Sequence, residues 1–185
     1  MNQFASNRRS RFAFLRWAVV TVPAINFLGV ASSRLAPMGS DNPWYRALIK
    51  PELNPPGWAF GVAWTILYVL MGLSLAMVLD ARRARGRGLA LLFFALQMIA
   101  NLAWSPLFFG LHRITAALFV IVVMFALTVV TTLLFARIRS AAALLLIPYL
   151  LWMIFAGYLN LRIDQRNPDA DGHLVSGGAS TQIAL

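Results

Sequence analysis

The chain alternates between long apolar segments and short polar ones. The apolar segments cover residues 17–35, 57–79, 89–111, 114–136 and 141–161, and the charged residues lie almost entirely between them. Each segment is close to the ~20 residues that a helix needs to cross the roughly 30 Å hydrocarbon core of a bilayer. In lipid the backbone must satisfy its own hydrogen bonds, which favours helices. The pattern therefore predicts an all-α integral membrane protein, a bundle of five transmembrane helices.

Three polar stretches complete the expected domain organisation. Residues 1–16 form a basic N-terminal tail, which we interpret as a topology anchor rather than a twin-arginine export signal, because no small-residue cleavage site follows the apolar segment. Residues 36–56 form a long loop between the first two helices, and long ordered loops are commonly functional. Residues 163–185 are polar, and we expect this tail to be disordered, at least beyond about Pro168.

Composition supports a membrane location and assigns the positive charge to topology. Of the 185 residues, 60% are hydrophobic and only 12% are charged, so an ordinary soluble domain is excluded. The net charge of +10 could suggest nucleic acid, but the basic residues flank the apolar segments, as membrane topology requires. We therefore expect the lipid bilayer, and no nucleic acid, as a partner. Ten of the sixteen basic residues lie on the N-terminal side, which predicts a cytoplasmic N terminus.

The residues that usually carry catalysis or bind metals are absent from the apolar segments. The chain has no cysteine, and none of its six acidic residues lies inside a predicted span. His112 falls in a turn and His173 in the tail, so neither has partners at metal-ligand or triad spacing. We expect no metal site and no conventional catalytic residue. Coupled transport is also disfavoured, because it normally requires an ionisable group within the bilayer.

Three of the predicted helices carry an aromatic stripe that includes small or amide residues. At helical spacing the stripes are Gly61, Trp64, Tyr68 and Gly72; Gln97, Asn101, Trp104 and Phe108; and Tyr149, Trp152, Ala156 and Asn160. Amides are costly in hydrocarbon, so Gln97, Asn101 and Asn160 are expected to face the bundle interior. There they would either join helices by hydrogen bonds or line a pocket.

Position along the spans separates two roles for the tryptophans. Trp17, Trp44 and Trp58 lie near span ends, where an interfacial belt or packing in the loop explains them. Trp64, Trp104 and Trp152 lie well inside their spans, where a belt does not. We interpret these three as the lining of one pocket for a large, flat, apolar ligand.

Several of these residues occur in a recognisable order. The run Trp44-Tyr45, Leu48, Lys50-Pro51, Asn54-Pro55-Pro56, Trp58, Phe60, Trp64, Tyr68 and Met71-Gly72 resembles the signature of the TspO/MBR family. Gln97, Asn101, Trp104-Ser105 and Phe108-Phe109-Gly110 resemble its third helix, and Pro148-Tyr149, Trp152, Ala156 and Leu159-Asn160 its fifth. The resemblance covers roughly residues 25 to 162, with three separated motifs in the family's order.

The resemblance implies a five-helix bundle whose long first loop closes a cavity for porphyrins, haem-type tetrapyrroles, sterols or benzodiazepine-type ligands. The positions it assigns to the cavity are Tyr45, Trp64, Tyr68, Asn101, Trp104, Trp152 and Ala156. The corresponding lid residues are Trp44, Lys50, Pro51, Asn54, Pro55 and Pro56. In the family, the tryptophans that match Trp64 and Trp152 are implicated in light-dependent porphyrin breakdown. A homodimer is also implied, in a bacterial inner membrane or, as in some relatives, an outer membrane.

Two departures from the family pattern bear on the ligand. Leu53 stands where the family commonly has a lid tryptophan. No Leu or Val occurs in the five residues before Tyr158, so the cholesterol motif that would end at Arg162 is incomplete. Protoporphyrin IX or another haem-type tetrapyrrole, bound without a covalent link, is therefore expected over a sterol-like ligand. We expect a sensor or regulator; the alternatives are a transporter and a light-dependent porphyrin-degrading enzyme.

Overall fold

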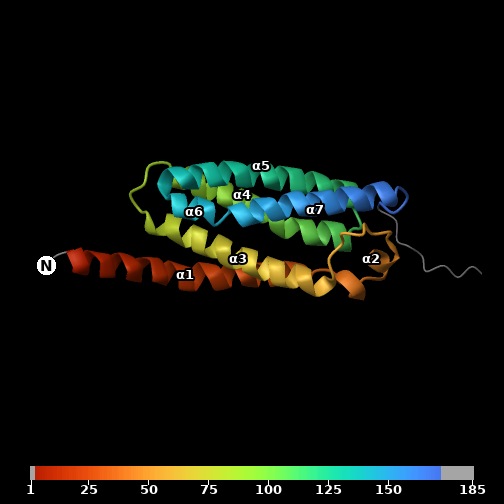
Figure 1. Ribbon diagram of the computed structural model, residues 1–185, viewed down its shortest axis with the longest axis horizontal. Coiled ribbons are helices and arrows are strands. Elements are labelled where there is room, and N and C mark those ends of the chain that lie inside the picture. The colour runs from red at the N-terminus through yellow and green to blue at the C-terminus, as the bar shows by residue number, and fades with distance from the viewer. Residues whose placement is uncertain (1–2, 172–185) are drawn as a thin grey trace, which may run out of the picture.

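The computed structural model describes residues 3–171, with side chains from residue 14 onward. Its long helices are α1 (Gln3–Ser33), α3 (Gly57–Asp80), α4 (Arg87–Ser105), α5 (Ile114–Ile138) and α7 (Ile147–Arg166). They lie side by side along one axis (Figure 1). Five helical segments are long and apolar enough to cross a membrane, and the described part of the chain contains no strand. The predicted five-helix membrane bundle is confirmed.

Prolines divide two of the expected spans. The segment predicted as one helix over 141–161 consists of α6 (Ser140–Leu144) and α7, with Pro148 at the start of α7. A proline ring clashes with the carbonyl four residues earlier, here that of Leu144, the last residue of α6. The span predicted over 89–111 likewise leaves the α form at Pro106, and a π-helical turn, η2 (Pro106–Gly110), completes it.

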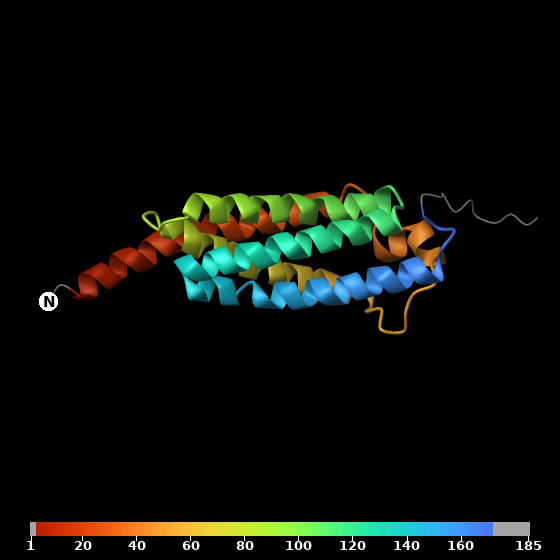
Figure 2. The same cartoon turned by 90° about the horizontal axis from the view of Figure 1, so that it is seen from above.

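The N-terminal segment is helical, where the sequence suggested only a basic tail before residue 17. Helix α1 begins at Gln3 and continues unbroken to Ser33, passing through Pro23. Its first part extends beyond the end of the other helices (Figure 2). The membrane-spanning part is Phe14–Ser33, so the basic segment is a helical extension of the first span.

The 36–56 segment contains two short helices, where the sequence analysis treated it as one loop. These are η1 (Gly39–Asp41) and α2 (Pro43–Ala47). The Asn42 side chain caps α2 by accepting a hydrogen bond from the Tyr45 N–H, and Pro43 occupies the first helical position. Asparagine at the N-cap followed by proline is a favoured helix start. We refer to residues 36–56 as the lid, because α2 lies across one end of the bundle (Figure 1).

Helices α1 and α3 approach closely through glycines. A Cβ atom on Gly72 would lie 2.7 Å from the Val22 Cα, and the Thr21 hydroxyl donates to the Gly72 carbonyl at 2.8 Å. Two turns further along α1, Gly29 leaves space for the ring of Tyr68, whose carbons lie within 2.1 to 2.8 Å of the position of a Cβ there. Small residues at such contacts are typical of membrane helix pairs. They position the aromatic face of α3.

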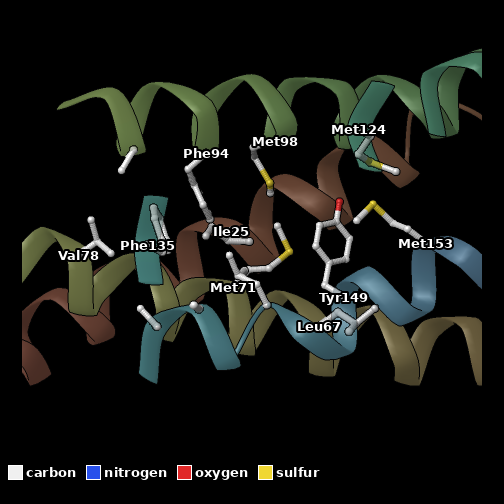
Figure 3. Close-up of a cluster of buried hydrophobic side chains, with 14 of the residues drawn as sticks. Ile25, Leu67, Met71, Val78, Phe94, Met98, Met124, Phe135, Tyr149 and Met153 are labelled. Atoms are coloured by element: carbon white, nitrogen blue, oxygen red, sulfur yellow. The ribbon is translucent and has the colours of Figure 1, made fainter. Parts of the chain in front are cut away.

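The remaining core lies between α3, α4, α5 and the α6–α7 segment. It includes Met71, Phe94, Met98, Phe135 and Tyr149, all buried. Figure 3 shows the Tyr149 ring rising from α7 into this cluster with its hydroxyl directed toward α4. The core therefore places a polar atom in an apolar interior, and that atom needs a partner.

The C-terminal segment is ordered as far as it is described, so the expectation of a disordered tail is wrong for its first part. Helix α7 continues to Arg166, and residues 167–171 form turns against the lid and the start of α5. Although the segment is polar, its side chains form hydrogen bonds to other segments, and these bonds hold it in place. Residues 172–185, including His173, lie outside the described part.

Candidate ligand site and its lid

An aromatic cluster lies between α3 and α7. The Trp64 ring lies 5.3 Å from that of Tyr68 and 6.5 Å from that of Trp152, between ring centroids. Phe60 packs edge-on against Trp152 at 6.0 Å, and Trp64 reaches Tyr149 at 6.2 Å. Edge-to-face pairs of this kind are favourable beyond the area they bury. We call these five residues the α3–α7 cluster.

An apolar groove opens to the outside next to this cluster. Its volume is about 410 Å³, and Trp152 forms part of its wall. The other lining residues are Ala63, Ile66 and Leu67 from α3 and Pro148, Leu151 and Phe155 from α7. This groove opens sideways between α3 and α7, and it is distinct from the lid-closed cavity that the family resemblance implies.

A chain of hydrogen bonds joins three helices behind the cluster. The Tyr68 hydroxyl donates to the Asn101 Oδ1 at 2.9 Å, and the Asn101 Nδ2 donates to the Tyr149 hydroxyl at 2.7 Å. Asn101 and Tyr149 are buried. The chain holds the two tyrosine rings in place and satisfies polar atoms that would be costly alone.

Other buried polar atoms of the predicted stripes have no hydrogen-bond partner within the described residues. They are the indole Nε1 atoms of Trp104 and Trp152 and both amide atoms of Gln97 and Asn160. Gln97, Asn101 and Asn160 are 1%, 5% and 2% exposed, so the prediction that these amides face the interior is confirmed. Buried polar groups are stabilised by pairing, so a bound molecule or water that pairs with these atoms would be favoured here.

The structure divides the predicted site residues between two clusters. Trp104 stacks on Phe108 at 5.1 Å, and Tyr45 packs edge-on against Phe109 at 5.2 Å. We call this group the lid cluster. The three interior tryptophans were expected to line one pocket, but only Trp152 lines the groove. Trp64 packs against Trp152 without lining the groove, and Trp104, a member of the lid cluster, also packs against the core.

The remaining predicted cavity residue, Ala156, is half-buried on α7 one turn beyond Trp152. It follows Trp152 and precedes Asn160 on the same face of the helix. Its small side chain adds no polar group to the site and leaves room between its larger neighbours on this face.

The predicted lid residues interact mainly with one another. The Tyr45 hydroxyl donates to the Asn54 Oδ1 at 3.3 Å, and the Asn54 N–H donates to the Pro51 carbonyl at 3.0 Å. Lys50 donates to the Leu48 carbonyl and lies 4.7 Å from the centre of the Tyr45 ring. Pro55 is half-buried, and Pro56 directly precedes α3 as its N-cap. The lid is thus an ordered segment with hydrogen bonds of its own.

Trp44 anchors the lid to the end of the bundle. It is 4% exposed, and its ring stacks on His112 at 4.4 Å between centroids. His112 occupies the left-handed region, with φ of 55°. The proposed packing role of Trp44 in the loop agrees with this burial, whereas Trp58 is 73% exposed, as expected of a belt residue.

A second anchor comes from residues 166–171, which we call the C-terminal clamp. The Asn167 Oδ1 accepts from the Ile49 N–H at 2.9 Å, and its Nδ2 donates to the Ile49 carbonyl at 3.0 Å. Arg166 donates to the Lys50 carbonyl at 2.9 Å. The Asp171 carboxylate accepts from the Ile114 N–H at the start of α5, where a negative charge is favoured. The clamp therefore ties the lid to α5 and α7.

Burial changes the proton affinity of three groups in the lid region. Burial raises the pKa of the Tyr45 phenol above its usual value, although the hydrogen bond to Asn54 opposes this. Burial lowers the pKa of the Lys50 amine, and it also lowers the pKa of His112 against an opposing backbone hydrogen bond at Phe109. All three shifts favour the neutral form of the side chain.

No group of three or more potential metal-binding side chains occurs in residues 3–171. The described site offers stacking surfaces, two unpaired indole donors and amide groups. An aromatic wall with a few polar groups is the usual composition of a pocket for a flat organic ligand.

The TspO/MBR family model matches residues 19–166, which include the aromatic stripes, the lid and nearly all of the bundle. The chain belongs to the TspO/MBR family. Tryptophan-rich protein TspO of Chlorobaculum tepidum is 43% identical over 143 residues, 76% of this chain and 89% of that protein.

Relatives within the family carry names of different kinds. Protein CrtK of Rhodobacter capsulatus is 36% identical over 151 residues, 80% of this chain and 94% of that protein. Translocator protein of Bos taurus is 34% identical over 143 residues, 76% of this chain and 82% of that protein. The resemblance inferred from the motifs is thus confirmed, and the family spans bacterial and mammalian members.

Sequence reasoning missed several residues of the site. Tyr149 was placed on a stripe but not in the site, although it completes the hydrogen-bond chain through Asn101. Its spacing from Trp152 was a sufficient signal. Other contacts join segments that are far apart in sequence, and no local pattern predicts them. These are the stack of His112 on Trp44 and the hydrogen bonds of Asn167 and Asp171.

Proposed function

We propose that this protein binds a tetrapyrrole of the porphyrin or haem type within the membrane and acts as a sensor or regulator. One observation carries the proposal: an aromatic cluster stands beside an apolar groove, and Trp152, which lines the groove, has a buried indole N–H with no acceptor within the described residues. A flat conjugated ring offers stacking, and peripheral carboxylates offer the acceptor.

The size and position of the groove support such a ligand. Its 410 Å³ falls within the range of about 300–1,000 Å³ that is typical of small-molecule sites. The groove opens between two spans, at the depth of lipid, and porphyrins are large apolar rings that partition into bilayers.

Charge placement favours sensing over coupled transport. In the described spans the charged side chains lie near the span ends, for example Asp80 in the last turn of α3 and Arg87 in the first turn of α4. Proton- and ion-coupled transporters place ionisable groups near the middle of the bilayer. Relatives are named both tryptophan-rich sensory protein, in Cereibacter sphaeroides, and translocator protein, so uncoupled ligand transfer is the alternative.

A light-dependent reaction is the second candidate, and the Trp64–Trp152 pair favours it. The two indoles lie edge to face at 6.5 Å, so a porphyrin bound against Trp152 would have two oxidisable rings close to it. Under this candidate, light and dioxygen supply the oxidising power, and the bound ring is consumed.

Titration of the purified protein with protoporphyrin IX tests both candidates. In darkness we expect saturable binding, with a shift of the Soret band and quenching of tryptophan fluorescence. A Soret band that then stays constant under illumination supports the sensor, whereas light-driven loss that requires Trp64 and Trp152 supports the reaction. Absence of saturable binding in darkness would contradict the proposed function.

A further inference from the structure

A second pocket lies at the opposite end of the bundle from the lid. Its volume is about 580 Å³, and Arg16 of α1 and residues 80–84 of the α3–α4 turn line it. Both views show this turn at the end of the bundle from which α1 extends (Figures 1 and 2). Three of the lining side chains are arginines: Arg16, Arg82 and Arg83. We call this space the arginine pocket.

The turn that carries two of these arginines is structured. The Arg82 N–H donates to the Asp80 carbonyl at 2.8 Å, and the Ala84 N–H donates to the Ala81 carbonyl at 3.0 Å. Gly86 adopts φ of 77°, a conformation that glycine reaches without strain, and α4 follows directly. Arg82 and Arg83 are therefore held on a defined backbone.

Negative groups near the pocket are already paired. Asp80 is its one acidic lining residue, and the Asp80 Oδ2 accepts from Arg139 at 3.0 Å. The carbonyls at the end of α3, which would repel an anion, accept hydrogen bonds from Arg87 at Val78 and Leu79. Arg16, Arg82 and Arg83 form no ion pair within the described residues, so their charge is available to a ligand.

We propose that the arginine pocket binds the phosphate headgroup of an anionic phospholipid. The pocket lies at the ends of two membrane spans, α1 and α3, which is where headgroups lie. Guanidinium groups bind phosphate oxygens through paired, charge-assisted hydrogen bonds. Basic pockets between transmembrane helices are known to bind such headgroups. The site is independent of the tetrapyrrole groove, because it shares no residue with it.

Two double variants separate a pocket from general surface charge. Arg82→Gln/Arg83→Gln removes two lining arginines, whereas Arg85→Gln/Arg137→Gln removes the same charge from exposed positions at the same end that do not line the pocket. Native mass spectrometry of the detergent-solubilised protein with phosphatidylglycerol or phosphatidylcholine measures how much lipid stays bound. Circular dichroism checks that each variant is folded, and Arg16→Gln is a further test if the pocket double variant unfolds.

We expect wild type to bind phosphatidylglycerol more tightly than phosphatidylcholine. The pocket variant should lose about tenfold or more in affinity for phosphatidylglycerol, and the control variant roughly twofold or less. Equal losses in both variants, or equal binding of the two lipids, would overturn the proposal. Competition by millimolar inorganic phosphate alone, with no preference for the lipid, would show a free-anion site and overturn the lipid assignment.

Discussion

The side chain of Asn167 hydrogen-bonds both the N–H and the carbonyl of Ile49, at 2.9 and 3.0 Å. One amide thus pairs with both backbone polar groups of Ile49, and it joins the residue after α7 to the lid. The same amide also donates to the Ile163 carbonyl at 2.8 Å, which orients it on α7. Two contacts therefore hold the lid: the stack of Trp44 on His112 and the hydrogen bonds of the C-terminal clamp.

Removal of this contact should loosen the lid. In Asn167→Ala both bonds to Ile49 are lost, and each is worth about 1 kcal/mol or less at an exposed position. We expect tryptic cleavage after the exposed Arg46 in the lid to become several-fold faster, while helical content is unchanged. This measurement needs no ligand, so it tests the clamp independently of the proposed function.

Asp169→Ala is the matched control, because Asp169 is exposed in the same segment and its side chain forms no hydrogen bond within the described residues. Its cleavage rate should equal that of wild type. If Asn167→Ala is also cut at the wild-type rate, residues 166–171 do not restrain the lid.

The two glycines at the ends of the α3 stripe should respond in opposite ways to alanine. In Gly72→Ala the new Cβ would lie 2.7 Å from the backbone of Val22, so α1 must move away, at a cost of about 1–3 kcal/mol. Gly61 has no atom within 4 Å of that position, so Gly61→Ala should be neutral or slightly stabilising. Thermal unfolding in detergent compares them, and equal effects would refute the close packing of α1 on α3.

The hydrogen-bond chain through Asn101 should stabilise the fold as a unit. Asn101→Leu leaves two tyrosine hydroxyls without their partner in the interior, and we expect a loss of about 1–2 kcal/mol in unfolding free energy. Adding Tyr68→Phe and Tyr149→Phe removes the unpaired hydroxyls as well and should recover part of that loss. Further destabilisation of the triple variant, by the sum of the single effects, would show that the three groups act separately.

Features that repeat along the chain were predictable from sequence. Five apolar segments of membrane-spanning length and three stripes at helical spacing were sufficient for the bundle and for the burial of Gln97, Asn101 and Asn160. The sequence also contains two local signals for helix boundaries that the prediction did not use. The Asn42-Pro43 pair is a helix start that would have predicted α2, and Pro148 would have predicted the break after Leu144.

Contacts between segments that are far apart in the chain could not be predicted from the sequence. Asn167 and Asp171 lie in a polar segment whose composition predicts disorder, and their hydrogen bonds to Ile49 and Ile114, far away in sequence, help to order it. In the same way, the packing of the lid residue Tyr45 against Phe109 of η2 joins segments that are far apart in the sequence. Helical spacing shows which residues share a face, but it does not show which face meets which.

Membrane orientation follows from charge and can be tested with single cysteines, because the chain has none of its own. The N-terminal side carries most of the basic residues, so we predict that it is cytoplasmic. A cysteine at Ser140, exposed at the start of α6, should resist impermeant reagents in intact cells. A cysteine at Ser40, exposed in the lid, should react. The reverse pattern would overturn the orientation.

The affinity for protoporphyrin IX of tryptophan variants tests the central claim most directly. Trp64→Phe and Trp152→Phe each remove stacking area from the α3–α7 cluster, and a loss of about 1 kcal/mol corresponds to a several-fold rise in Kd. Trp58→Phe is the control, because Trp58 lies on the same helix as Trp64 but is 73% exposed. Titration in darkness should show weaker binding in the first two variants and wild-type binding in the third. Wild-type affinity in both cluster variants, or an equal loss in Trp58→Phe, would contradict a tetrapyrrole site at the α3–α7 cluster.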